Sequence, residues 1–144
     1  MENVQNFNVK SSMMERGMAL SGVVGMSLGA FAVGWFNPST AGFFPVCPFL
    51  SLTGIACPGC GLTRGFHAGF HGDILGALDF NLLLPFFLFF FGYLFISLFL
   101  TFARGRGLNF NVFKPWAIWT FFGFAFVFTI LRNLPIYPFN ILYP

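Results

Sequence analysis

All three cysteines and both histidines of the chain lie between positions 47 and 71. Cys57 and Cys60 are separated by two residues, a spacing that presents two thiols on one tight turn. Cys47, together with His71 or His67, would supply the further ligands of a tetrahedral, zinc-like metal ion. A metal site is therefore one interpretation of this segment.

Two other interpretations of the cysteines stay open. A cysteine at a helix N-terminus, close to Arg64, would have a lowered thiol pKa and could act in thiol redox chemistry. Alternatively, a disulfide between two of the three cysteines staples the segment and leaves the third unpaired. No covalent haem is expected, because Gly61 and not histidine follows Cys60.

A helix is predicted over residues 58–71, and it would gather the polar candidates. Steps of four, three and four residues place one set on a single face, namely Cys60, Arg64, His67 and His71. A row of small residues runs beside that face, namely Gly61, Gly65 and Gly69. Because each glycine costs a helix up to ~1 kcal/mol relative to alanine in water, the row predicts a neighbour packed against it. Asp73 would cap a second short helix that follows.

The composition identifies lipid as the main solvent of the chain. The mean hydropathy is +0.80, and 57% of the 144 residues are apolar while only 8% are charged. The formal charge of +3 is scattered along the chain, with no basic run or stripe that could follow a phosphate backbone. We therefore expect a membrane protein that does not bind nucleic acid.

Three uncharged segments are long enough to cross a bilayer, at residues 17–36, 82–103 and 116–131. The first ends at Asn37-Pro38 rather than at a small-residue cleavage site, which favours a membrane helix over a signal peptide. Asn81 is expected to cap the second. The predicted fold is an all-α membrane protein of three transmembrane helices, with a Cys/Gly-rich, partly helical extracytoplasmic cap at residues 37–81. The predicted organisation is a cytoplasmic N-terminal tail, 1–16, and a single membrane domain, 17–144.

The distribution of basic residues predicts the orientation. Most of them flank one end of the predicted spans, namely Lys10, Arg16, Arg104, Arg106 and Lys114. The positive-inside rule then places the N-terminus in the cytoplasm and the cap and C-terminus outside the bacterial cytoplasmic (inner) membrane. Small residues at intervals of four in the first span predict close helix packing, within the chain or against another subunit, through Ser21, Gly25 and Gly29.

Several motifs carry a family resemblance, namely Cys47-Pro48, Thr53-Gly54, Cys57-Pro58-Gly59-Cys60-Gly61-Leu62-Thr63-Arg64, His71-Gly72-Asp73, Phe80-Asn81, Arg132-Asn133-Leu134-Pro135 and Pro138-Phe139. This pattern closely resembles the signature of a bacterial membrane-protein family, domain-of-unknown-function family 2752. The likeness covers nearly everything after residue 40. It implies a small multi-pass protein without an established activity, and it marks seven positions to test, namely Cys47, Cys57, Cys60, Thr63, Arg64, His71 and Asp73.

The favoured function is non-enzymatic, since the chain has few catalytic groups and no charge within its spans. We predict a structural or accessory subunit of a larger membrane complex, with a cap stapled by its cysteines. The alternative is a thiol-redox or metal protein at the outer membrane face, using the three cysteines with His71 or His67. In that case Thr63 and Arg64 would contact an anion or substrate. The lipid bilayer is a partner in either case.

Overall fold

The computed structural model describes residues 11–108 and 114–137, and this part of the chain is all-helical. Its elements are α1 (Met13–Trp35), α2 (Pro48–Thr53), α3 (Leu62–Phe70), α4 (Ile74–Phe80), α5 (Leu84–Arg104) and α6 (Pro115–Arg132). The predicted fold class is confirmed. Residues 1–10 of the predicted tail, which include Lys10, and the Pro138-Phe139 motif lie outside the described residues.

Three of these helices, α1, α5 and α6, are long and apolar enough to cross a membrane. Their most apolar stretches have mean hydropathies of 1.6, 2.3 and 1.4, yet only 6%, 6% and 17% of those stretches are buried within the protein. Apolar side chains that the fold leaves exposed are solvated by lipid in a membrane protein. The chain is therefore a multi-pass membrane protein.

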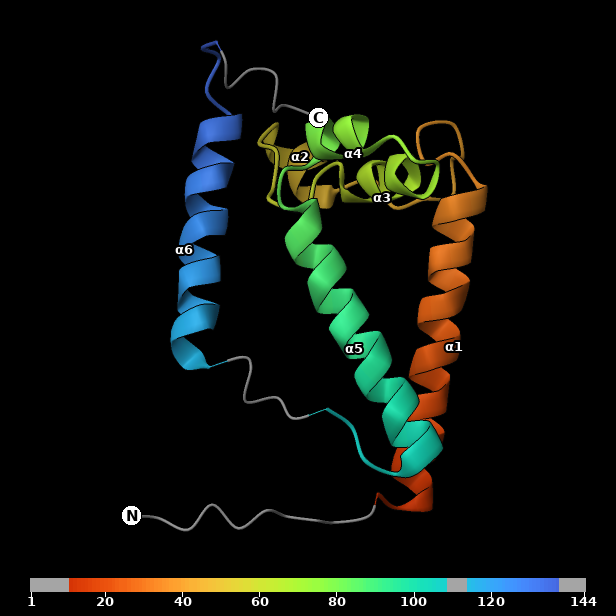
Figure 1. The fold of residues 1–144 in the computed structure, drawn as a ribbon. Helices are drawn as coiled ribbons and strands as arrows, with labels where there is room; N and C mark the ends of the chain where they lie inside the picture. Colours follow the sequence, from red (N-terminus) through yellow and green to blue (C-terminus); the bar gives the residue numbers. More distant parts are fainter. Residues whose placement is uncertain (1–10, 109–113, 138–144) are drawn as a thin grey trace.

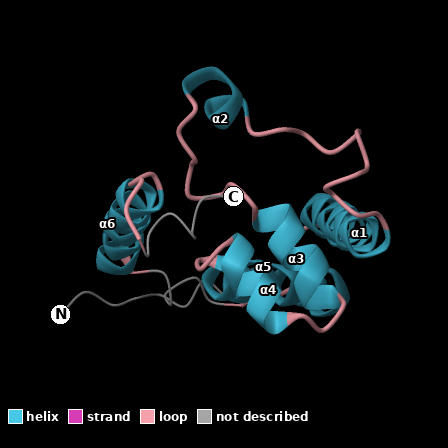
Figure 2. Cartoon of the chain, turned by 90° about the horizontal axis from the view of Figure 1, so that it is seen from above, coloured by secondary structure: helices cyan, strands magenta, loops and turns pink. Residues whose placement is uncertain are grey.

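The short helices form a cap across one end of the long ones (Figure 1). Seen from above, α3 and α4 lie over the start of α5, with α1 on one side and α6 on the other (Figure 2). The chain reaches this cap from the end of α1, and α5 leaves it. The predicted Cys-rich region between the first two spans is thus a folded layer of three helices.

The helix boundaries differ from the predicted ones where local hydrogen bonds decide them. α1 begins at Met13, four residues before the predicted start, because Ser12 and Glu15 form a capping box. The Ser12 amide donates to Glu15 Oε2 at 2.8 Å, and the Glu15 amide donates to Ser12 Oγ at 3.3 Å. The prediction that Asn81 caps α5 is wrong, because Leu83 occupies the N-cap position.

Two contacts fix α1 against α5. Midway along the helix, a Cβ atom at Gly22 would come within 3.0 Å of the Leu98 side chain, so the absence of a side chain allows the approach. At the end far from the cap, the Arg16 guanidinium donates to the carbonyls of Phe102 (2.8 Å and 3.0 Å) and Ala103 (3.3 Å). These carbonyls lie in the last turn of α5, where intrahelical donors run out.

α6 meets the start of α5 through aromatic packing. The buried side chains there are Leu83, Ala125 and Phe128, with Phe87 and Phe121 packed against them. Phe86 also stacks on Phe121, with 4.0 Å between ring centroids. This packing brings the C-terminal end of α6 to the cap.

Candidate functional site

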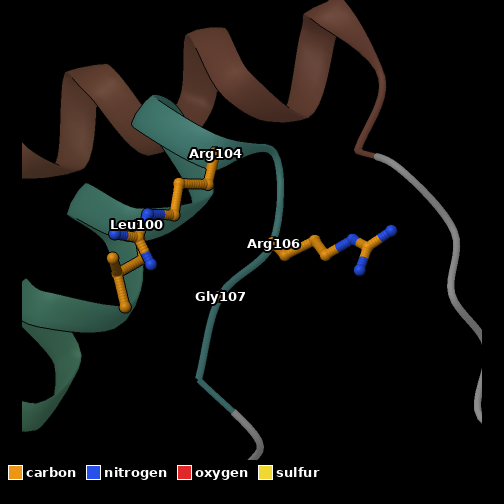
Figure 3. Close-up of a pocket in the computed structure, with 4 residues that line it drawn as sticks. All are labelled: Leu100, Arg104, Arg106 and Gly107. Atoms are coloured by element: carbon orange, nitrogen blue, oxygen red, sulfur yellow. The ribbon is translucent and has the colours of Figure 1, made fainter.

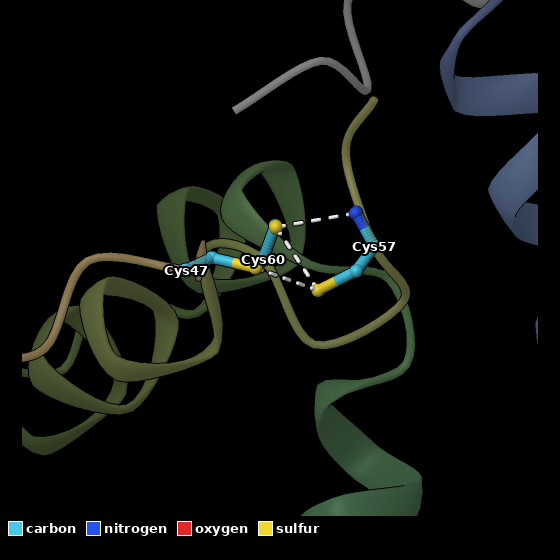
Figure 4. Close-up of side chains that lie close together, drawn as sticks. All are labelled: Cys47, Cys57 and Cys60. Atoms are coloured by element: carbon cyan, nitrogen blue, oxygen red, sulfur yellow. Dashed lines mark hydrogen bonds between the residues drawn. The ribbon is translucent and has the colours of Figure 1, made fainter. Parts of the chain in front are cut away.

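The three cysteine thiols converge within the cap (Figure 4). Their Sγ atoms all lie within 4.8 Å of one another. Cys57 is the middle member, with its Sγ 3.3 Å from that of Cys47 and 3.0 Å from that of Cys60. All three are free thiols, so the predicted disulfide is not formed in this structure. We call this group the thiol cluster.

Two local structures hold the thiols. Cys47 is the N-cap residue of α2, a short helix that Pro48 begins and Gly54 ends in the left-handed conformation (φ 71°). Cys57 and Cys60 bracket a turn closed by a hydrogen bond from the Cys60 amide to the Cys57 carbonyl at 3.0 Å. The Cys57 amide also donates to Cys60 Sγ at 3.2 Å. The turn therefore places Cys60 Sγ next to Cys57.

The helix predicted over residues 58–71 begins later than expected. Gly61 is the N-cap of α3 and has a φ of 81°, a left-handed conformation that a non-glycine residue adopts only with strain. Cys60 consequently belongs to the turn and not to the helix. The prediction that Cys60 shares a helical face with Arg64, His67 and His71 is wrong for this reason.

Side chains from two other elements hold the carbonyl groups of the cysteine turn. Asn81 is buried, and its Nδ2 donates to the carbonyls of Pro58 (2.8 Å) and Cys60 (3.1 Å). Arg132, fully buried at the end of α6, donates from one guanidinium nitrogen to the carbonyls of Cys57 (3.0 Å) and Cys60 (3.1 Å). Its guanidinium also lies over the Phe128 ring, 5.1 Å from the centroid.

Asn133 extends this contact to the residue before the turn. Its side-chain amide receives a hydrogen bond from the Ala56 amide at 2.8 Å and donates one to the Ala56 carbonyl at 2.9 Å. Ala56 has no exposed surface, so these bonds replace water that cannot reach it. Arg132 and Asn133 together attach the cysteine turn to a membrane helix more than 70 residues away in sequence.

The environments of the outer two thiols differ. The Leu50 backbone amide, in the first turn of α2, is the main cause that lowers the pKa of Cys47 to about 7, and burial opposes it. Burial raises the pKa of Cys60 to about 12, and the neighbouring Cys57 thiol adds to that effect. The cluster thus pairs Cys47, a partly exposed thiol with a lowered pKa, with Cys60, a buried thiol with a raised pKa.

Both histidines bind the end of α1 rather than joining the thiols. His67 Nδ1 lies 2.7 Å from the Val33 carbonyl oxygen, and His71 Nε2 lies 3.1 Å from the Gly34 carbonyl oxygen. These carbonyls belong to the last turn of α1, where no further helical amide is available. Among the described residues, the group close enough to share a metal ion contains the three cysteines and no histidine.

The remaining predicted site residues lie elsewhere in the cap. Thr63 and Arg64 are exposed in the first turn of α3. Asp73 caps α4 as predicted, and its carboxylate accepts from the Gly76 amide at 2.9 Å. The structure thus brings together the cysteines and leaves the predicted anion-contact residues on the surface.

The two rows of small residues, one in the cap and one in α1, have different surroundings. Gly65 is buried, and a Cβ there would come within 2.6 Å of Leu84 Cδ1 and 3.0 Å of the Ala77 carbonyl oxygen. At Gly69 a Cβ would reach the Ala77 side chain at an ordinary 3.9 Å. In α1, by contrast, a Cβ at Gly25 or Gly29 would meet nothing within 4 Å, and Ser21 is exposed.

The residues that sequence reasoning did not assign to the site are Asn81, Arg132 and Asn133. Asn81 was interpreted as a helix cap, and the Phe80-Asn81 and Arg132-Asn133 motifs contributed to the family resemblance without a role at the cysteines. The available signal was the polar pair Arg132-Asn133 directly after an apolar helix, because an arginine and an amide side chain at that place are costly unless they find partners.

Comparison with known proteins addresses the same segment. Residues 47–95 match the family model described as protein of unknown function (DUF2752). This match confirms the predicted resemblance to the family over residues 47–95, while the Arg132-Asn133-Leu134-Pro135 motif lies outside the matched segment. The DUF2752 match begins at Cys47, includes the thiol cluster, α3, α4 and Asn81, and ends within α5. No curated protein and no solved structure matches the chain.

Proposed function

We propose that this protein is a membrane-anchored metal-binding protein in which Cys47, Cys57 and Cys60 hold a thiophilic ion such as zinc. The observation that carries the proposal is the convergence of the three Sγ atoms within 4.8 Å. Sulfur ligands about 2.3 Å from a tetrahedral zinc lie roughly 3.8 Å apart. The observed separations of 3.0 Å and 3.3 Å reach that value with small side-chain rotations.

The held turn supports metal binding in a second way. Ligand residues bind a metal tightly when outer contacts fix their orientation, and loss of such contacts typically costs 10–100-fold in affinity. Asn81 and Arg132 provide contacts of this kind to the backbone of Cys57 and Cys60. The positive charge of Arg132 next to the turn also favours the negative charge of a metal–thiolate group.

Thiol redox chemistry is the second candidate, and the difference in pKa between the outer thiols favours it. Cys47, with a pKa of about 7, is the thiol suited to attack a disulfide, while Cys60, with a pKa of about 12, stays protonated. Cys57 lies within reach of both. In this function the Cys47 thiolate would attack a substrate disulfide and release one substrate thiol, and Cys57 would then displace the second as a Cys47–Cys57 disulfide forms. An external dithiol would reduce that disulfide and complete the turnover.

For the membrane arrangement we infer a bacterial inner-membrane protein with a cytoplasmic N-terminal tail (1–16) and a single membrane domain (17–144). The exposed basic residues Arg104, Arg106 and Lys114 lie at the end away from the cap, and the positive-inside rule places that end in the cytoplasm. The thiol cluster then faces the outside. Impermeant thiol labelling of intact cells would confirm this orientation, and labelling only after lysis would contradict it.

We also propose that the protein is an accessory subunit of a larger membrane complex. Ser21 and the glycines Gly25 and Gly29 leave a smooth strip on α1, which would allow another helix to approach closely. Co-purification after mild solubilisation tests this proposal. A Gly25→Leu variant should release such a partner while leaving the thiol cluster intact.

The deciding experiment for the metal proposal measures bound metal and free thiols in one sample, purified in detergent without chelator. We expect one metal ion per chain and its loss in single Cys→Ser variants at each of the three positions. His71→Ala is the matched control, since it removes a possible ligand outside the cluster. Metal-free protein with one reactive thiol would support redox chemistry instead, and metal-free protein with three reactive thiols would contradict both functions.

A further inference from the structure

We propose that the end of α5 away from the cap binds the phosphate headgroup of an anionic phospholipid, at a hollow lined by Arg104 and Arg106. This site is independent of the thiol cluster. Its ligand is defined by two features that the structure places together, namely guanidinium groups and an apolar helix surface. Its position, at the end of a membrane-spanning helix, is where phospholipid headgroups lie.

The site is an open hollow of about 620 Å³, lined by Leu100, Arg104, Arg106 and Gly107 (Figure 3). Arg104 lies back along the last turn of α5 beside Leu100, whereas Arg106 extends to the opposite side from the segment that follows the helix. Both arginines are exposed. The lining thus offers charge at the helix end and apolar surface one turn further into the membrane.

Arg104 and Arg106 are not needed as hydrogen-bond donors to the last carbonyl groups of α5. Basic residues at a helix C-terminus commonly bind its last carbonyl groups. Here Arg16 binds the carbonyls of Phe102 and Ala103, while the Gly105 amide binds that of Thr101. Within the described residues, no acceptor forms a hydrogen bond or ion pair with Arg104 or Arg106. Their donors therefore face outward, available to an anion.

The backbone that carries Arg106 is held in place. Gly105 turns the chain with a φ of 71°, and its carbonyl accepts from the Ser11 amide at 3.0 Å. The following segment lies against α5, where a Cβ at Gly107 would come within 2.7 Å of Thr101 Oγ1 and 2.9 Å of Ser97 Oγ. The Leu108 amide then donates to Ser97 Oγ at 3.1 Å. Both arginines thus extend from backbone of defined position.

Lipid phosphate and free phosphate share the same guanidinium chemistry, and the surroundings favour the lipid. A free anion would contact only guanidinium groups, whereas a phospholipid at Arg104 also covers Leu100 and the apolar surface of α5 with its acyl chains. Anionic headgroups also raise the local concentration of the ligand at a membrane surface. We therefore assign an anionic phospholipid, with phosphatidylglycerol as the probe.

The test is native mass spectrometry of the full chain in detergent, titrated separately with phosphatidylglycerol, phosphatidylcholine and inorganic phosphate. We expect retention of phosphatidylglycerol over phosphatidylcholine, and a loss of roughly fivefold in affinity for each of Arg104→Gln and Arg106→Gln. Lys114→Gln is the matched control, because it removes one exposed charge near the same end of the molecule. It should leave retention unchanged. Circular dichroism and size exclusion establish that each variant is folded.

Three results would overturn the proposal. Unchanged phosphatidylglycerol retention in the Arg104→Gln/Arg106→Gln double variant would show that the lipid does not bind at these arginines. An equal loss in Lys114→Gln would show general charge attraction at this end of the protein. Displacement of the lipid by millimolar inorganic phosphate, or equal binding of phosphate alone, would identify a free-anion site instead.

Discussion

The Asn133 side chain and the Ala56 backbone form a two-bond pair, with the amide of each donating to the carbonyl of the other at 2.8 Å and 2.9 Å. The side-chain amide of Asn133 thus offers one donor and one acceptor to Ala56, as a backbone peptide group does. The pair fixes the residue directly before Cys57. Ala56 is fully buried, so these two bonds to Asn133 satisfy its backbone amide and carbonyl in place of water.

Replacing Asn133 with alanine should destabilise the protein. Both polar groups of Ala56 would lose their partners, and each buried unsatisfied group costs about 1–3 kcal/mol. Thermal unfolding in detergent measures this effect, with Asn37→Ala as the control, since Asn37 bonds to Ser39 in an exposed turn. Equal melting temperatures for the two variants would contradict the importance of the Asn133 pair.

Replacing Arg132 with lysine should weaken metal binding by about 10–100-fold, because the shorter lysine side chain ends before the position of Arg132 Nη1, the atom that donates to both cysteine carbonyls, and loses the contact of the guanidinium with the Phe128 ring. Competition with a chromophoric chelator measures the affinity. Arg64→Lys, at an exposed position of α3, should bind as wild type. If both variants keep full affinity, Arg132 serves packing alone.

The histidines should behave as helix caps and not as ligands. His67→Leu removes the donor to the Val33 carbonyl, and a lost hydrogen bond of this kind lowers stability by roughly 0.5–1.5 kcal/mol. We expect a lower melting temperature with an unchanged metal content per chain. Loss of metal from the folded variant would show instead that His67 is a metal ligand.

Metal affinity should depend on pH in two regimes. Because its pKa is raised to about 12, Cys60 keeps its proton at every accessible pH, so a metal must displace that proton to bind. The pKa of Cys47, lowered to about 7, adds a further proton to displace only below pH 7. The logarithm of the affinity should therefore fall as pH decreases, and fall more steeply below pH 7 by about one unit per pH unit.

Chelator competition between pH 6 and 8.5 tests these regimes. Cys47→Ser should remove the change of slope near pH 7 while the general decrease with acidity remains. A single slope in the wild type would mean that Cys47 does not bind the ion as a thiolate.

Two glycine-to-alanine changes should have opposite effects. At Gly65 a new Cβ would collide with Leu84 and the Ala77 carbonyl, and overpacking of this kind costs about 1–3 kcal/mol. At Gly25 a new Cβ meets nothing within 4 Å, so the variant should gain slightly in stability, because alanine has less backbone freedom to lose than glycine. Thermal unfolding of both variants in the same detergent makes the comparison. Similar destabilisation would show that a partner outside this chain covers Gly25.

The three spans were predictable because uncharged stretches of 16 to 22 residues in lipid have few alternatives to a helix. Their ends were less so, although Ser12 and Glu15 are a readable capping box that places the start of α1 four residues earlier than hydropathy does. Hydropathy reports where lipid begins, whereas capping bonds decide where the helix begins.

The thiol cluster was predictable as a set of residues but not as an arrangement. The spacing of Cys57 and Cys60 indicates a shared turn, yet only the fold of the cap brings Cys47 to them. The helical period placed Cys60 on α3, and the left-handed Gly61 overrides that period. The bonds from Arg132 depend on where α6 ends in space, which no local pattern contains.

The attachment of the cysteine turn to Arg132 and Asn133 sets an order of events during synthesis. Cys47, Cys57 and Cys60 leave the ribosome long before α6, so the thiols exist for a time without the side chains that fix their turn. Insertion of the third span then completes the cap. A nascent chain halted before Arg132 should carry reactive but poorly organised thiols, so the proposed metal would be loaded late in maturation.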